Sequence, residues 1–182
     1  MARTLLLFLI SSLLAYSFSP ELSRVEPRGG QLGSEIQLQL YGNRLNEPQE
    51  LLLYHKGLTV KSLTPSKDGK SVKAVIAIAP DAPLGEHPMR LRCKDGLTYM
   101  RTFWVGQFPT VMEARTKDKK RDLNDSFKEP QKVDLNVTVQ GVADREDDDY
   151  YQVQCKKGQR LSVEVEAMRL GRVMFDPYVA IL

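Results

Sequence analysis

The feature that most constrains this chain is an alternation of apolar and polar residues with a period of two. Between Glu35 and Val105 it recurs in short runs, and no window of about twelve residues there shows a helical period. Successive side chains of a strand point to opposite faces, so each run predicts a strand with one buried face. The alternating residues are Ile36, Leu38 and Leu40; Met89, Leu91 and Cys93; and, in a weaker run, Tyr99, Arg101 and Phe103.

Turn-forming residues separate these runs. The segments 41–43, 67–69 and 94–96 each place Gly beside Asn or Asp, and 80–85 combines two Pro residues with Asp and Gly. Strands of about five to eight residues with turns at roughly every tenth position are typical of an antiparallel β-sandwich. The first half of the chain is therefore predicted to form one.

The second half repeats the pattern. Alternating runs cover Val133–Val139, Tyr151–Cys155 and Leu161–Ala167, and another begins at Tyr178. These predict a second sandwich with three and a half strands in about seventy residues, which is marginal for an independent core. We therefore expect this half to be truncated at its C-terminal end, as the N-terminal part of a longer protein.

The first 19 residues have the composition of a secretory signal peptide. Arg3 provides a positive charge, Leu5–Leu14 an apolar run, and Ala15-Tyr16-Ser17 a cleavage site with small residues. The run is too short for a transmembrane helix, which needs about 20 apolar residues. A buried N-terminal helix is the alternative, but the segment has no polar face to turn toward water. We expect a secreted, periplasmic or cell-surface protein.

Composition excludes several classes of protein. With 182 residues, 42% hydrophobic and 27% charged, the chain is unsuited to extended disorder, and a net charge of +3 predicts no nucleic-acid partner. Two Cys and two His exclude a disulfide-dense scaffold, and the wide separation of His55 and His87 excludes a zinc-finger site.

Catalytic motifs are also missing from the sequence. His55 falls in a turn and His87 at the start of a strand, where a surface or turn role is expected rather than that of a base. No Gly-x-Ser-x-Gly, His-Glu-x-x-His or phosphate-binding Gly loop occurs. The sequence predicts a protein that is not an enzyme.

Two resemblances to known families cover nearly all of the chain after the signal peptide. The segment Val25–Gly33, the run Glu35–Gly42 and the closing Ala82–His87 resemble an immunoglobulin-like domain of the IPT/TIG type. The later motifs resemble a bacterial pre-peptidase C-terminal (PPC) domain; they are Leu123–Phe127, Val137–Gly141, Asp147–Tyr151, Lys157–Leu161 and Phe175–Tyr178. The resemblances imply an all-β protein with two tandem antiparallel β-sandwiches, the first Ig-like and the second a partial, jelly-roll-like PPC unit. The expected divisions are a signal peptide over 1–19, the Ig-like domain over 20–108, a charged linker and the start of the PPC unit over 109–129, and the partial PPC sandwich over 130–182.

The PPC resemblance also implies a calcium site. PPC domains usually open with Glu-Pro-Asn, whereas this chain has Asp122-Leu123-Asn124 after a basic insertion, so the carboxylate is one carbon shorter. In the related collagen-binding domains of bacterial collagenases, acids before the first strand and acids before an Asp-aromatic pair hold Ca²⁺. The residues that this nominates are Asp122, Asn124, Asp125, Glu146 and Asp149, with Glu113 more weakly. The alternative is that the acidic run is a solvated turn.

These observations predict a non-catalytic secreted or cell-surface module that binds or acts as a spacer. The expected partner is an extracellular polymer or protein, such as a polysaccharide, a collagen-like chain or a cell-surface component, or another domain of the same chain. The alternative is a processing or targeting segment of a secreted peptidase or hydrolase whose catalytic domain lies elsewhere. Cys93 and Cys155 fall on inward phases of different predicted domains, so we expect buried free thiols rather than a disulfide.

Overall fold

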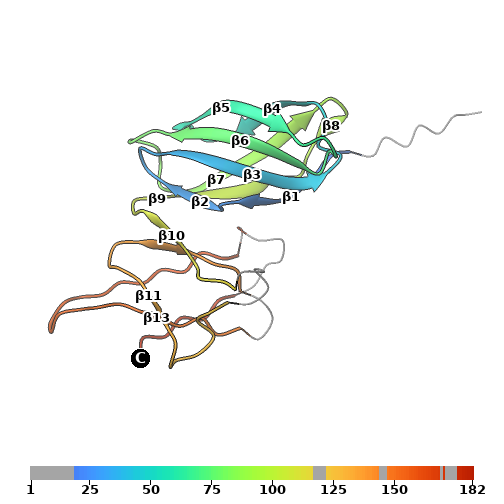
Figure 1. Ribbon diagram of the computed structural model, residues 1–182. Coiled ribbons are helices and arrows are strands. Elements are labelled where there is room, and N and C mark those ends of the chain that lie inside the picture. The colour runs from blue at the N-terminus through green and yellow to red at the C-terminus, as the bar shows by residue number, and fades with distance from the viewer. Residues whose placement is uncertain (1–18, 117–121, 144–146, 169, 171–175) are drawn as a thin grey trace, which may run out of the picture.

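The chain folds into two stacked β-structures (Figure 1). A computed structural model describes residues 19–116, 122–143, 147–168, 170 and 176–182. Every regular element in this part of the chain is a strand, which confirms the all-β prediction. No helix among the described residues is long and apolar enough to cross a membrane. Most of the predicted signal peptide, and Glu146, lie outside the described residues.

The first structure is a sandwich of two sheets. One sheet has the order β1-β3-β6-β5 and is antiparallel throughout. The other has the order β2-β9-β7-β4, with β8 paired to β7, and it is antiparallel except where β2 runs parallel to β9. The strands of the two sheets are β1 (Glu21–Glu26), β3 (Glu35–Asn43), β6 (Ser71–Ile78) and β5 (Leu58–Pro65), then β2 (Gly29–Gln31), β9 (Arg101–Gly106), β7 (Gly85–Cys93), β4 (Pro48–Leu53) and β8 (Gly96–Leu97).

The core lies between these two sheets. The buried side chains alternate along the strands as predicted and include Leu38, Leu40, Val72, Ile76, Met89, Leu91, Phe103 and Val105, all fully buried. Removing each such side chain from water contributes about 1.5–3 kcal/mol. The alternation that identified strands β3 and β7 is therefore the burial pattern of the sandwich.

Two predictions within this sandwich are wrong. Tyr99 is 74% exposed, because β9 begins only at Arg101 and the preceding residues form a loop. His87 is 2% exposed rather than a surface residue, because β7 begins at Gly85 and turns its third side chain inward. His55 does lie in an exposed turn.

The described residues of the second half form four short strands in two pairs. β10 (Thr110–Met112) pairs with β12 (Thr138–Gln140), and β11 (Gln131–Lys132) pairs with β13 (Tyr151–Gln152). Both pairs are parallel, not antiparallel as predicted. The predicted strand Val133–Val139 is interrupted at Asn136, whose φ of 58° reverses the chain direction locally.

The segment 153–168 forms no strand, although alternation predicted two. Val163 and Val165 are each 48% exposed, and no described segment pairs with them. Strand residues also need a hydrogen-bonding neighbour, so alternation without one does not make a strand. For the same reason Cys155 is exposed rather than buried; Cys93 is buried as predicted, and both thiols are free.

Candidate metal site

Four aspartates of the second half converge on one point. Asp122, Asp125, Asp147 and Asp149 each offer a carboxylate oxygen, and these oxygens lie within 4.8 Å of one another. Asp122 is buried, Asp147 and Asp149 are half-buried, and Asp125 is exposed. Three of the nominated calcium ligands are therefore brought together. We call these four residues the acidic cluster.

Backbone hydrogen bonds hold the two contributing segments side by side. Arg115 and Asp122 form an isolated antiparallel bridge, and the Leu123 amide donates to the Ala114 carbonyl at 2.9 Å. On the other side the Tyr150 amide donates to the Asn124 carbonyl, also at 2.9 Å. The segment that carries the first two aspartates is thus fixed between the end of β10 and the start of β13.

Asn124 is the most enclosed residue of the site. Its side chain is 0% exposed, and Nδ2 donates to Asp149 Oδ1 at 3.2 Å. Its Oδ1 is buried, and among the described residues it has no hydrogen-bond donor. An unsatisfied buried polar atom costs about 1–3 kcal/mol. The Asn124 amide thus contacts the acidic cluster through Nδ2, while its Oδ1 is left without a donor.

Glu113 lies behind the acidic cluster and is 7% exposed. Oε1 accepts a hydrogen bond from the Tyr151 hydroxyl at 2.6 Å, and Oε2 accepts one from the Val142 amide at 3.0 Å. The close approach of Gly141 leaves no room for a side chain, since a Cβ there would lie 2.7 Å from both carboxylate oxygens. Both oxygens of Glu113 are engaged, so it contributes charge from behind the four aspartates.

The crowding of these acids raises their pKa values. Burial, followed by the charges of Glu113 and Asp147, raises the pKa of Asp149 to about 7. Burial and Glu113 also raise the pKa of Asp122, against the opposing charge of Arg115, whose Nε lies 2.5 Å from Asp122 Oδ1. Without a cation, Asp149 therefore holds a proton for part of the time at neutral pH.

The pKa of the Tyr151 phenol is raised by burial and by its hydrogen bond to Glu113. The phenol therefore remains a hydrogen-bond donor to Glu113 throughout the physiological range.

The dimensions of the cluster suit a hard cation. Calcium binds oxygen at 2.3–2.6 Å, which places opposite ligands about 4.6–5.2 Å apart, whereas magnesium at 2.0–2.1 Å requires about 4.0–4.2 Å. The carboxylate oxygens of the acidic cluster all lie within 4.8 Å of one another, which is compatible with a calcium coordination sphere. The four aspartates could hold a metal ion.

Sequence reasoning missed Asp147 and Tyr151. Asp147 and Asp149 are two residues apart and face the same side, while the exposed Asp148 between them lies outside the cluster. In an extended segment, side chains two residues apart point to the same side, so this alternation would have selected Asp147 together with Asp149. The link from Tyr151 to Glu113 joins residues 38 positions apart, and no local pattern indicates it.

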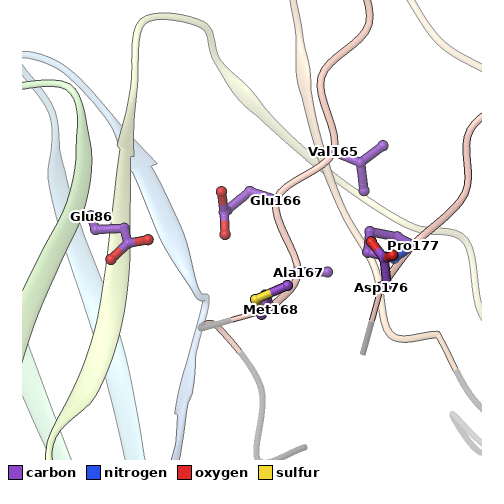
Figure 2. A pocket seen from close by; sticks show the side chains of 7 residues that line it. All are labelled: Glu86, Val165, Glu166, Ala167, Met168, Asp176 and Pro177. Carbon is purple, nitrogen blue, oxygen red and sulfur yellow. The ribbon is translucent and has the colours of Figure 1, made fainter. Parts of the chain in front are cut away.

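A hollow lies between the two β-structures. It has a volume of about 310 Å³, and Figure 2 shows Glu86 of β7 and Glu166 of the C-terminal segment facing each other across it. Asp176 also lines it, so its charged side chains are acids. We assign it no binding role.

The His87 imidazole is enclosed and is not available as a base of the Ser-His-acid kind. The Nε2 of His87 donates to the Pro83 carbonyl at 2.6 Å, and its Nδ1 is enclosed by the protein. His55 packs edge-to-face against it, with ring centroids 5.3 Å apart. A base must reach its substrate, and the His87 imidazole is sealed inside the sandwich.

Comparison of the sequence with protein-family models and with curated proteins gave no match.

Proposed function

We propose that this chain is a non-catalytic extracellular module that serves in binding or as a spacer, and that its second half carries a calcium ion. The chain is then a two-part arm exported by its N-terminal signal peptide, with an Ig-like first sandwich and a PPC-like second half. Its role is to position a larger protein on an extracellular polymer or at the cell surface.

The observation that carries this proposal is the acidic cluster together with the buried Asn124, whose Nδ2 donates to Asp149. Exposed acids alone are common on protein surfaces, but here Asp122 is buried and the Asn124 Oδ1 is enclosed without a donor. Like charges at such distances repel, and a bound cation converts that repulsion into attraction. A bound cation would therefore stabilise this arrangement.

Calcium is favoured over other cations by chemistry and by location. The ligand set is all oxygen, and calcium accepts six to eight such ligands in flexible geometry, whereas magnesium keeps most of its waters. Extracellular calcium modules have dissociation constants of about 10⁻⁴–10⁻³ M. Such weak sites are filled only where calcium is near millimolar, which agrees with an exported protein.

A non-catalytic role agrees with the enclosed state of His87. His87 is buried with its Nε2 bonded to a backbone carbonyl, and His55 is stacked against it. A module that binds a partner or positions another domain does not need an accessible histidine.

Thermal melting with and without calcium tests the proposal. At about 1 mM Ca²⁺ the expected dissociation constants give a stabilisation of about 0.4–1.4 kcal/mol, which raises the melting temperature by about 2–10 °C. Asp122→Asn and Asp149→Asn should each remove this response, because both carboxylates belong to the acidic cluster. Asp148→Asn is the matched control, since it removes the same charge from the exposed residue between two ligands. Asp134→Asn, exposed near β11, is a second control.

Identical melting curves in calcium and in excess chelator would remove the basis for the site. An equal loss of response in Asp148→Asn would show that the effect is general screening of negative charge. In either case the acidic run would be a solvated turn.

A further inference from the structure

An exposed face of the first sandwich carries an arginine without an acceptor. Side chains of β7 alternate, so Met89 and Leu91 point into the core and Arg90 points to the outer face of the β2-β9-β7-β4 sheet. Arg90 is half-buried, and no described residue forms a hydrogen bond or an ion pair with it. Its Nε is enclosed by the protein, whereas its terminal Nη groups are open to solvent.

The other five arginines of the first sandwich, whose residues from 19 to 106 are all described, each have an acceptor. The pairs are Arg24 with Glu26, Arg28 with the Leu170 carbonyl, Arg44 with the Ser19 carbonyl, Arg92 with Glu50, and Arg101 with the Ser23 carbonyl. Arg92 is the next outward residue of the same strand and is more exposed than Arg90, yet it is paired. The positive charge of Arg90 is therefore the one that this sandwich leaves unmatched among its arginines.

Apolar side chains border Arg90 on the side of β4. Leu52 is directly opposite Arg90 in the antiparallel register, where Cβ atoms are about 4.5–5.5 Å apart. Tyr54 follows two residues later, and its amide donates to the Pro88 carbonyl at 3.2 Å. Leu52 and Pro88 are half-buried, and Tyr54 is 53% exposed.

The loop before β9 borders Arg90 on the other side. Residues 98–101 run alongside residues 89–91 of β7, which places Tyr99 and Met100 next to Arg90. Tyr99 is 74% and Met100 49% exposed, so neither side chain packs into the sandwich. β4 lies on the side of the first sandwich away from the second half (Figure 1). We call this exposed surface the arginine patch; it consists of Arg90, Leu52, Tyr54, Tyr99 and Met100.

The arginine patch suits a ligand that combines a carboxylate with an apolar face. A guanidinium binds a carboxylate through two parallel hydrogen bonds, and its open Nη groups are the donors for them. Apolar neighbours keep water away from such a contact, which strengthens the attraction between the two charges. The same neighbours offer apolar area that a ligand can cover.

A sugar chain fits this surface better than a peptide does. β7 is a central strand whose backbone is paired with β4 on one side and with β9 on the other, so it offers no free edge for an added strand. A peptide laid over Arg90 would hold its amide groups against apolar side chains without partners. A uronic acid carries its carboxylate on a ring with apolar C–H faces, and its hydroxyl groups remain in water at the rim.

We propose that the arginine patch binds an acidic polysaccharide, with Arg90 holding the carboxylate of one uronic acid residue and Leu52 and Tyr99 packing against its ring. This inference names the polymer for the binding role proposed above and rests on that role. It does not depend on the calcium site, which lies in the second half of the chain.

Isothermal titration calorimetry of the full chain with an oligomer of galacturonic acid tests the inference. The titrations are made in chelator, because calcium would bind to the oligomer as well as to the acidic cluster. The parent should bind the oligomer. The methyl-esterified oligomer has the same rings without the charges, so it should bind at least about tenfold more weakly, because charge-assisted hydrogen bonds are lost.

Two variants and one matched control locate the binding. Arg90→Gln should weaken binding of the oligomer at least about tenfold, and Tyr99→Ala should weaken it about threefold or more. Lys73→Gln removes one positive charge from an exposed position of β6 in the opposite sheet, so its affinity should stay within about twofold of the parent. Because Tyr99 is exposed, Tyr99→Ala leaves the fold intact and keeps the test valid if Arg90→Gln is unstable.

The results that would overturn the inference are distinct. An equal loss of affinity in Arg90→Gln and Lys73→Gln would show general attraction to a chain with a net charge of +3. Equally tight binding of an oligomer of glutamic acid would reject a polysaccharide in favour of an acidic peptide. If the parent does not bind the galacturonic acid oligomer but its melting temperature responds to calcium, the inference fails and the calcium site of the proposed function stands.

Discussion

Calcium binding to this chain should displace a proton from Asp149. The pKa of this carboxyl is raised to about 7 by burial and by the charges of Glu113 and Asp147. A cation needs the ionised form, so proton and cation compete for the same group. The competition should be visible across the neutral pH range, where ordinary carboxylates no longer titrate.

The expected magnitude follows from that pKa. In the cation-free protein Asp149 is about 90% protonated at pH 6, about 50% at pH 7 and about 10% at pH 8. Each calcium ion should therefore release about 0.9, 0.5 and 0.1 protons at these three values, and the dissociation constant should be about tenfold weaker at pH 6 than at pH 8.

Isothermal titration calorimetry in pairs of buffers with different ionisation enthalpies measures this release. The slope of the observed enthalpy against the buffer enthalpy gives the number of protons at each pH. Asp149→Asn removes the titrating group and should abolish the release together with most of the affinity, while Asp148→Asn should preserve the parent values. Calcium binding with no proton release at pH 6 would refute the assignment of a proton to Asp149.

Three other predictions address stability and reactivity. The folded state binds the Asp149 proton more tightly than the unfolded state, where the pKa is about 3.9. The free energy of unfolding in chelator should therefore fall as pH rises from about 4 to 7, by about 2 kcal/mol after allowance for solvent screening. A flat profile of urea unfolding over this pH range would contradict the prediction. Gly141→Ala should weaken calcium binding, because the new methyl group would displace the Glu113 carboxylate, and an unchanged calorimetric titration would disprove this. In native protein the exposed Cys155 should react at once with a thiol reagent, whereas Cys93 should react only in denaturant, because burial shields the Cys93 thiol and raises its pKa. Equal reaction rates of the two thiols in native protein would be inconsistent with the structure.

The sequence by itself determined the class of fold and the strands of the first sandwich that carry strong alternation. In β3 and β7, Leu38, Leu40, Met89 and Leu91 occupy the phase that the pattern assigns to the core, and all four are fully buried. The prediction succeeds because the burial of one strand face appears in the sequence as an alternation of apolar and polar residues with a period of two. The resemblance to PPC domains, rather than alternation, nominated Asp122, Asn124 and Asp149, and the structure brings them together.

Only the tertiary structure decided which alternating segments become strands and which acids share a site. Leu161–Ala167 alternates as clearly as β3 does, yet it is not a strand, because no described neighbour supplies its hydrogen bonds. Glu113 is placed behind the cluster by the Tyr151 hydroxyl and the Val142 amide, which are 38 and 29 residues away. Strand partners and charged neighbours come from distant parts of the chain. A local pattern therefore indicates that a segment favours strand structure, but not which contacts will complete it.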